Sequence, residues 1–220
     1  MSQGWVLLAI ESAAILAFAV SGIAEGIRSR MDAVGLATVG FVTAFGGGTL
    51  RDVLLDRRPF VWVERVEYLW LVVALVLAAP LVARRVQRLP AWPLQWLDAL
   101  GLGLFAASGT ALALRADMPA TVAVMMGVVT AAFGGVMRDL LCHRLPQLLS
   151  DHRPYALCAL AGSCVLVGLR QADVPPELAL LVAAGTGTLL RMLALARGWE
   201  LPRIVGRAAR AGDRPGRGPS

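Results

Sequence analysis

The chain has 220 residues, of which 57% are hydrophobic and 16% are charged, whereas a soluble domain carries about 25% charged residues. The composition therefore excludes an ordinary soluble domain and predicts an all-α polytopic membrane protein. The formal net charge of +6 does not indicate nucleic-acid binding, because the basic residues are all arginines that lie mainly between the apolar runs and in the tail.

Seven apolar runs follow one another along the chain, and each approaches the roughly 20 residues that a helix needs to cross a bilayer. The runs are Trp5–Ala24, Ala33–Leu55, Val66–Val82, Leu94–Leu114, Ala120–Leu141, Tyr155–Leu169 and Leu178–Ala196. The first run lacks the basic residues that precede a cleaved signal, so we expect it to be retained. The sequence thus predicts seven transmembrane helices.

The arginines between the spans predict how the chain is oriented. The segments after spans one, three, five and seven carry most of them, as Arg28, Arg84 and Arg144 illustrate. The positive-inside rule places such segments in the cytoplasm, so we expect the amino terminus outside and the carboxyl terminus inside. The predicted location is the cell (inner) membrane, with membrane lipids as partners.

The second half of the chain repeats the first at an offset of 87 positions. GGGTLRD at 46–52 recurs as GGVMRD at 134–139, and FAVSG at 18–22 recurs as FAASG at 105–109. Chance agreement between apolar sequences does not produce shared glycine, arginine and aspartate in one register. We therefore predict repeat one over 1–92, repeat two over 93–172, a seventh span over 173–197 and a disordered, Arg/Gly/Pro-rich cytoplasmic tail over 198–220.

Each predicted repeat holds three spans, an odd number, so the two copies enter the membrane from opposite sides as an inverted repeat. Glycines stand at equivalent places in spans two and five and are expected to break both helices. The glycines are Gly46, Gly47, Gly48, Gly134 and Gly135. A break frees backbone carbonyls, which bind a partly dehydrated monovalent cation, and the hydroxyls of Thr43 and Thr130 are candidates to assist. The alternative is that the glycines only allow tight packing.

Charged residues lie close to these glycines and at matching positions in spans one and four. They are Arg51, Asp52, Arg138 and Asp139 beside the glycines, with Glu11 and Asp98 in the other two spans. Charges inside a membrane usually face a wet cavity and pair with one another. We predict that they set the electrostatics of a pore or lock a gate, with each arginine paired either to a carboxylate of the other repeat or to Glu11 and Asp98. Snorkelling of the arginines to the membrane surface is the alternative.

Other kinds of site find little support in the sequence. No nucleophile–base pair, metal-ligand cluster or cofactor motif is present, so we expect no enzyme, no structural metal and no cofactor. The cysteines Cys142, Cys158 and Cys164 lie in or beside spans five and six and are predicted to be buried thiols.

The doubled motif resembles a known family. VTAFGGGTLRDVLL followed by Pro59, and VTAAFGGVMRDLL followed by Pro146, are similar to the twin signatures of prokaryotic trimeric intracellular cation (TRIC) channels, a family also labelled a glycine transporter domain. The resemblance implies seven spans and a homotrimer, with one potassium-permeable pore in each protomer that the kinked second and fifth helices line. It assigns the kinks and the pore charges to the glycines and the Arg–Asp pairs named above. Val136 departs from the first signature, where Thr49 stands, so we expect a pore that is only approximately symmetric.

Three functions follow as hypotheses. The leading one is a homotrimeric channel for monovalent cations, with potassium preferred, sodium as a second candidate ion, and transient potassium near the kinks. The second is a secondary carrier for a small amino acid such as glycine, held between a freed amide end and a freed carbonyl end. The third is a non-transporting membrane scaffold whose charges only anchor and pack.

Overall fold

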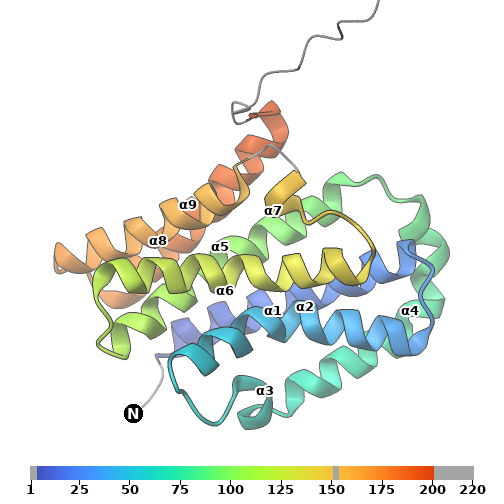
Figure 1. Cartoon of the computed structure of the whole chain (residues 1–220), viewed down its shortest axis with the longest axis horizontal. Coiled ribbons are helices and arrows are strands. Elements are labelled where there is room, and N and C mark those ends of the chain that lie inside the picture. The colour runs from blue at the N-terminus through green and yellow to red at the C-terminus, as the bar shows by residue number, and fades with distance from the viewer. Residues whose placement is uncertain (1–3, 151–153, 201–220) are drawn as a thin grey trace, which may run out of the picture.

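The computed structural model describes residues 4–150 and 154–200, and it is a bundle of helices (Figure 1). The long helices are α1 (Trp5–Arg28), α2 (Ala33–Leu54), α4 (Glu67–Arg88), α5 (Trp92–Arg115), α6 (Ala120–Leu141), α8 (Tyr155–Gln171) and α9 (Pro176–Arg197). Two short helices are α3 (Val61–Glu64) and α7 (Gln147–Ser150). Six of the long helices are long and apolar enough to cross a membrane, and α8 is an apolar helix of 17 residues. The predicted seven-helix fold is therefore confirmed, and the described residues form no β-strand.

Local sequence explains where several helices begin and end. α2 starts after Asp32, whose Oδ1 accepts a 2.8 Å hydrogen bond from the backbone N–H of Gly35. α9 stops before Gly198, which adopts a left-handed conformation with φ of 62° that glycine accepts without strain. α4 continues to Arg88, six residues past its predicted end at Val82, and its last turn carries Arg85 and Arg88, where positive charge is favourable.

The inverted repeat is visible in the turns as well as in the helices. α1, α2 and α4 form one copy, and α5, α6 and α8 form the other, with α3 and α7 following α2 and α6 at equivalent places. Arg30 and Asp56 have positive φ angles, and so do their counterparts 87 positions later, Asp117 and His143. Since few non-glycine residues adopt this conformation, its recurrence in one register extends the repeat to the connections.

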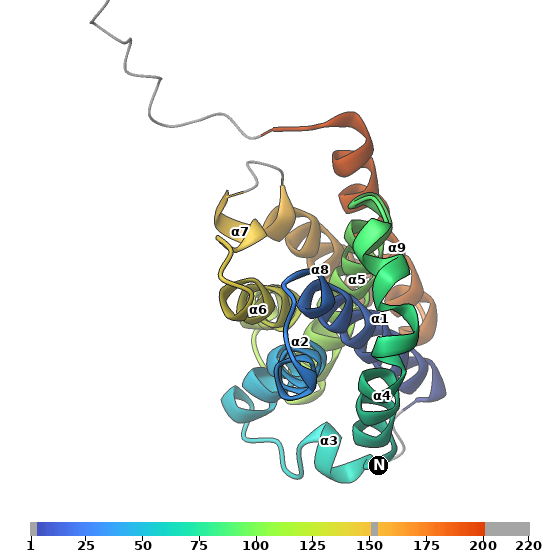
Figure 2. The same cartoon turned by 90° about the vertical axis from the view of Figure 1, so that its right-hand side faces the viewer.

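The helices differ in how much of their surface the bundle covers (Figure 1 and Figure 2). α5 contacts α1, α6, α8 and α9, whereas α4 lies at the edge against α1 and α2. α4 accordingly buries only Val72 and Ala79 and leaves Trp70, Leu77 and Leu81 exposed. Lipid tails are as apolar as leucine, so this outer face is suited to a bilayer.

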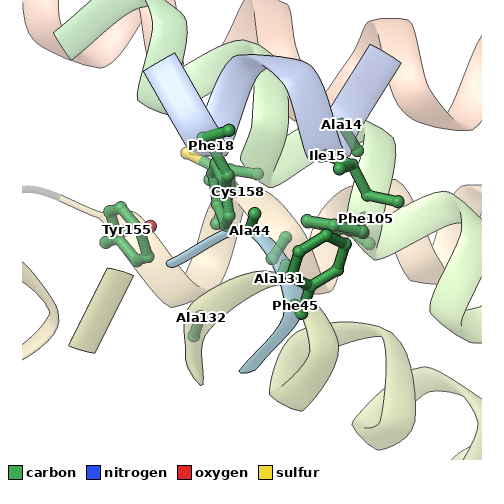
Figure 3. Close-up of a cluster of buried hydrophobic side chains, with 14 of the residues drawn as sticks. Ala14, Ile15, Phe18, Ala44, Phe45, Phe105, Ala131, Ala132, Tyr155 and Cys158 are labelled. Atoms are coloured by element: carbon green, nitrogen blue, oxygen red, sulfur yellow. The ribbon is translucent and has the colours of Figure 1, made fainter. Parts of the chain in front are cut away.

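α2 and α6 lie side by side, and each packs on the first helix of its own repeat. Behind them, aromatic and alanine side chains fill the space where the repeats meet (Figure 3). Phe18 of α1 and Phe105 of α5 pack edge to face with ring centroids 5.2 Å apart. These two residues hold the same position in the two repeats. Equivalent positions touch only near the axis that relates the copies, so the pseudo-two-fold axis passes between these rings.

The cysteines follow their predicted burial only in part. Cys142 and Cys158 are buried as predicted, but Cys164 is exposed, so the prediction is wrong for that residue. Cys164 lies on the side of α8 that borders an open groove with α6, where an apolar thiol meets lipid as readily as protein. Of the predicted tail over 198–220, residues 201–220 lie outside the described part of the chain.

Candidate functional site

The glycine motifs do not interrupt their helices. α2 continues through Gly46, Gly47 and Gly48, and α6 continues through Gly134 and Gly135. The predicted break is therefore wrong, and the nearby carbonyl groups remain part of regular helix. Each glycine costs only about 1 kcal/mol relative to alanine within a helix, and the packing of α2 against α6 outweighs that cost.

Two of the glycines instead let α2 and α6 touch. A Cβ atom on Gly47 would collide with the backbone carbonyl oxygen of Thr130, and a Cβ atom on Gly134 would collide with that of Thr43. In both cases the distance from the Cβ atom to the carbonyl oxygen would be below 3.0 Å, which Cβ atoms in proteins essentially never show. The two contacts exchange under the 87-residue offset, so the crossing of α2 and α6 also lies near the pseudo-two-fold axis. The packing interpretation is correct for these two residues.

The other glycines of the motifs have different surroundings. A Cβ atom on Gly46 would lie 3.7 Å from the side chain of Val42, and one on Gly48 would lie 3.8 Å from that of Arg51, which are ordinary contact distances. A Cβ atom on Gly135 would lie 2.9 Å from the hydroxyl of Tyr155. Close approach of the backbone therefore accounts for one glycine in each motif and leaves Gly46 and Gly48 without a packing requirement.

The two threonines of the motifs hold equivalent places beneath this crossing. The hydroxyl of Thr43 donates a 2.6 Å hydrogen bond to the carbonyl of Val39, and that of Thr130 donates one of 2.6 Å to the carbonyl of Met126. Both hydroxyls thus bond one turn back along their own helix. The first helix of each repeat approaches them closely because it carries a glycine there, Gly22 in α1 and its counterpart in α5.

A first charged cluster lies on one side of the crossing. Arg51 donates through Nη1 to Oε1 of Glu11 at 2.9 Å and through Nε to Oδ1 of Asp52 at 2.9 Å. These three side chains are buried, with Arg51 and Asp52 at 0% exposure. Arg57, which is partly exposed, approaches the same carboxylate with 3.7 Å between Nη1 and Oδ1. The pairing of Arg51 with Glu11 confirms one of the two predicted partners.

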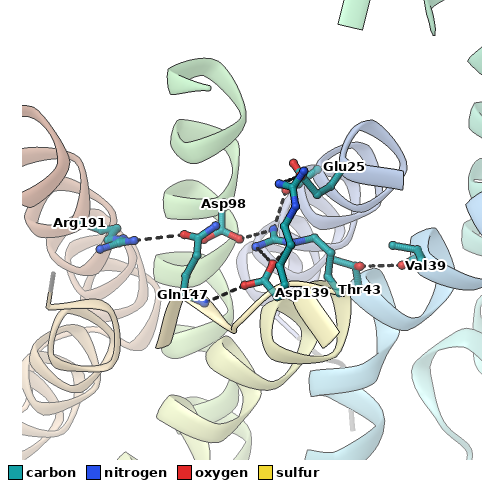
Figure 4. Close-up of polar contacts among 10 residues, drawn as sticks. Glu25, Val39, Thr43, Asp98, Asp139, Gln147 and Arg191 are labelled. Carbon is teal, nitrogen blue, oxygen red and sulfur yellow. Dashed lines mark hydrogen bonds and ion pairs between the residues drawn. The ribbon is translucent and has the colours of Figure 1, made fainter. Parts of the chain in front are cut away.

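A second cluster occupies the equivalent place in repeat two (Figure 4). Arg138 donates through Nη1 to Oδ1 of Asp98 at 2.6 Å and through Nε to Oδ1 of Asp139 at 2.9 Å. It also reaches across to repeat one, where Nη1 donates to Oγ of Ser21 at 2.9 Å. The second carboxylate oxygen of Asp139 accepts a 2.8 Å hydrogen bond from the backbone N–H of Gln147.

The burial of the two arginines decides between the alternatives for their role. Arg51 is 0% exposed and Arg138 is 3% exposed, so neither snorkels to the membrane surface. Both lie in the last turn of their helices, with Asp52 and Asp139 next to them, and not in the first turn after a break. Each arginine is shared by two carboxylates of its own repeat, so each cluster carries a formal charge of −1 apart from its outer neighbours.

Both clusters lie inside the span of the bundle. On α1, Glu11 touches the first cluster and Ser21 touches the second. Ten residues of helix separate them, or about 15 Å at 1.5 Å per residue, which is half the hydrocarbon thickness. The glycine crossing of α2 and α6 lies between. The bundle therefore holds one buried carboxylate–guanidinium cluster on each side of the crossing.

The structure adds residues that the sequence analysis missed. Arg191 of α9 is 1% exposed, lies 4.8 Å from the ring centroid of Tyr155, and donates to Oε1 of Gln147 at 3.4 Å (Figure 4). Glu25 of α1 forms an ion pair with Arg144, which follows α6. The signal for Arg191 in the sequence is an arginine within the apolar run of α9, but the repeat offers no counterpart that would indicate its partner.

Comparison with known proteins agrees with this architecture. A family described as "Glycine transporter" matches residues 8–84 and 95–171, which correspond to the two repeats. The UPF0126 inner membrane protein YadS of Escherichia coli K12 is 34% identical over 188 residues, which are 86% of this chain and 91% of that protein.

Solved structures show the same fold. A TRIC trimeric intracellular cation channel orthologue from Rhodobacter sphaeroides has a TM-score of 0.81 and 35% identity, over 88% of this chain and 99% of that chain. A second structure, described as the basis for conductance through TRIC cation channels, has a TM-score of 0.82 and 35% identity, over 91% and 98% of the two chains.

Two inverted three-helix repeats and a seventh helix, with an arginine buried between carboxylates in each repeat, define a multi-span membrane protein. The chain belongs to the family described as "Glycine transporter", and it is similar to UPF0126 membrane proteins and to bacterial TRIC channel structures.

Proposed function

We propose that this protein is a passive channel for monovalent cations, with potassium preferred over sodium. The observation that carries the proposal is the likeness to TRIC cation channels at 35% identity over nearly the whole fold. The site supports it, because each buried guanidinium is shared by two carboxylates. The partly exposed Arg57 balances the extra carboxylate of the first cluster, so it is a pathway beside the second cluster that would favour cations over anions.

The proposed pathway runs along α2 and α6 from one cluster to the other. The backbones of these helices touch at Gly47 and Gly134, and we propose that this contact closes the middle of the route, so that the structure corresponds to a closed state. Opening requires α2 and α6 to separate, which would bring water and a cation to the carbonyl groups of Thr43 and Thr130.

Recording from the purified protein in planar bilayers tests the proposal. We expect unitary current steps whose reversal potential, in asymmetric potassium chloride, follows the cation gradient. Replacing potassium by sodium on one side then gives the permeability ratio. An absence of steps, or a reversal potential that follows chloride, would refute the channel assignment.

Assembly and orientation are part of the same proposal. We propose a homotrimer with one pathway in each protomer, supported by the trimeric name of the Rhodobacter sphaeroides relative. We propose the amino terminus outside and the carboxyl terminus in the cytoplasm, supported by Arg28, Arg88 and Arg144 at one end of the bundle. Native mass spectrometry checks the trimer, and labelling of single cysteines in whole cells checks the orientation.

A carrier for a small amino acid is the second candidate, because the matching family is described as "Glycine transporter". Its signature would be saturable uptake of glycine into liposomes without unitary conductance. The unbroken helices weigh against it, since the backbone ends proposed to hold the zwitterion are not free in this structure. If alanine at both Gly47 and Gly134 leaves every flux unchanged, the protein is a scaffold instead.

A further inference from the structure

A cavity with mainly apolar walls lies beside α9, at the end of the bundle where α5 and α8 stop (left in Figure 1). Its volume is about 150 Å³, and apolar cavities of about this size take up a benzene-sized group. Its apolar lining includes Ala111 of α5, Leu166 of α8 and Leu180 of α9. Its charged lining consists of Arg115 and Arg170. The cavity therefore joins the seventh helix to two helices of repeat two.

The charged residues of the cavity stand at the helix ends, and apolar residues lie one turn further in. Arg115 is the last residue of α5, with Ala111 one turn before it, and Arg170 stands in the same relation to Leu166 on α8. One turn is about 6 Å of helix. Trp5 begins α1 at this end and is 72% exposed, as is usual for tryptophan at a membrane–water interface. The cavity thus changes from charged to apolar where a phospholipid changes from phosphate to acyl chain.

Repeat one has no equivalent of this pair of arginines. Arg28 stands 87 positions before Arg115, and its Nη2 donates to two backbone carbonyl oxygens at 2.6 Å and 2.8 Å. Ala83 stands 87 positions before Arg170, so a second cation is missing there. In the part of the chain that the structure describes, Arg115 has no such hydrogen bond or ion pair, and Arg170 donates at 3.4 Å to the carbonyl of Val174. Two guanidinium groups with spare donors therefore line one cavity.

Carboxylates at the same end indicate which headgroup fits. Nη2 of Arg115 and Oε1 of Glu177 both lie within 4.0 Å of the place that a Cβ atom of Gly4 would occupy. Asp117 and Asp173 stand in the turns that follow α5 and α8. Among the described residues, none of these carboxylates forms an ion pair with the arginines of the cavity. The end therefore carries unpaired charges of both signs, which complement a zwitterionic headgroup better than an anionic one.

We propose that this cavity binds one phospholipid whose headgroup carries a phosphate and a primary ammonium, as phosphatidylethanolamine does. The phosphate accepts hydrogen bonds from Arg115 and Arg170, whose planar guanidinium groups present paired N–H donors to it. The ammonium lies toward Glu177, and the first carbons of one acyl chain fill the cavity. The bound lipid connects α9 to α5 and α8. This inference does not depend on the proposed channel function.

Native mass spectrometry of the delipidated full-length protein, titrated with phosphatidylethanolamine, tests the proposal. Arg115→Gln and Arg170→Gln should each weaken binding by about fivefold, which corresponds to about 1 kcal/mol for each arginine at a membrane surface. Ala111→Leu narrows the cavity, keeps every charge and should also weaken binding. Arg85→Gln is the control, because Arg85 is an exposed arginine of α4 that does not line the cavity. It should change the dissociation constant by less than about twofold.

Two further ligands test the headgroup and the acyl chain. Phosphatidylglycerol lacks the ammonium and should bind the wild-type protein more weakly than phosphatidylethanolamine, and Glu177→Gln should remove most of that difference. Glycerophosphoethanolamine has the headgroup without acyl chains and should not compete with the lipid. The proposal is overturned if the wild-type protein retains no lipid, if it binds the two lipids equally, or if the chain-free headgroup competes. Equal losses in Arg85→Gln and Arg115→Gln would also overturn it.

Discussion

Substitution of single glycines by alanine distinguishes close helix contact from helix breaking. At Gly47 the new methyl group would meet the carbonyl of Thr130 inside 3.0 Å, whereas ordinary contact begins at 3.4 Å. The helices must therefore separate by more than the difference of 0.4 Å. Overpacking of this kind typically costs about 1–3 kcal/mol, and better helix propensity returns about 1 kcal/mol. We expect Gly47→Ala to lower the free energy of unfolding by up to about 2 kcal/mol.

The neighbouring glycines serve as controls in the same turn of α2. An alanine at Gly46 or Gly48 meets nothing nearer than 3.7 Å, so we expect stabilisation by about 1 kcal/mol from propensity alone. Reversible unfolding in mixed micelles, followed by circular dichroism, measures the three variants. Gly134→Ala should resemble Gly47→Ala, because it meets the carbonyl of Thr43. Equal destabilisation by Gly46→Ala and Gly47→Ala would show that these glycines serve a conformation other than the continuous helix.

Further predictions concern the charged clusters and the thiol. Arg138→Gln leaves two carboxylates buried without their guanidinium and should lower the free energy of unfolding by about 3–5 kcal/mol. Arg65→Gln, at an exposed ion pair, is the control and should change the free energy of unfolding by less than about 1 kcal/mol. Similar values for the two variants would contradict burial of the cluster. Ser21→Ala removes an acceptor from a charged donor and should cost about 1.5–3 kcal/mol, while Ser108→Ala, whose hydroxyl makes only a 3.4 Å contact, should cost clearly less in the same unfolding assay. Burial raises the pKa of the Cys142 thiol, so less thiolate is present at any given pH. With the other two cysteines replaced by alanine, maleimide should label the folded protein more slowly than a free thiol, and the labelling rate should reach half its maximum at higher pH. A labelling rate with the pH profile of a free thiol would refute this.

The sequence predicted the fold and the charged pairs because both follow from the repeat. The offset of 87 positions places Glu11 and Asp98 at one position, and Arg51 and Arg138 at another. A carboxylate and an arginine inside adjacent spans have few partners other than each other. Their pairing within each repeat was therefore one of two expected outcomes, and the structure selects it.

The role of the glycines could not be derived in the same way. A glycine within a helical sequence is compatible with a helix break and also with close packing of a second helix. Which of the two occurs depends on the residue that packs against the glycine in the folded protein. The partner of Gly47 is a carbonyl group 83 residues away, which no local pattern reveals. Arg191 escaped prediction for a related reason, since its contacts depend on how α9 docks against α7 and α8.

The two ends of the bundle differ although the repeats that form them are equivalent. Arg138 crosses from repeat two to Ser21 of repeat one. The corresponding contact would join Arg51 to Ser108, but in the described part of the chain the hydroxyl of Ser108 faces its own helix at the carbonyl of Phe105. Only one of the two arginines therefore ties the repeats together.

A second contact strengthens the same end. The ion pair of Glu25 with Arg144 also joins the repeats. Its counterpart cannot form, because the residue equivalent to Glu25 is Leu112, which offers no acceptor to Arg57. The buried hydrogen bond from Arg138 to Ser21 contributes about 1.5–3 kcal/mol, and the half-exposed pair of Arg144 with Glu25 adds at most about 1 kcal/mol. Separating α6 from α1 therefore meets more resistance at this end than separating α2 from α5 meets at the other. A movement that parts α2 from α6 at the glycine crossing should accordingly pivot about the Arg144 end and widen first beside the cluster of Glu11.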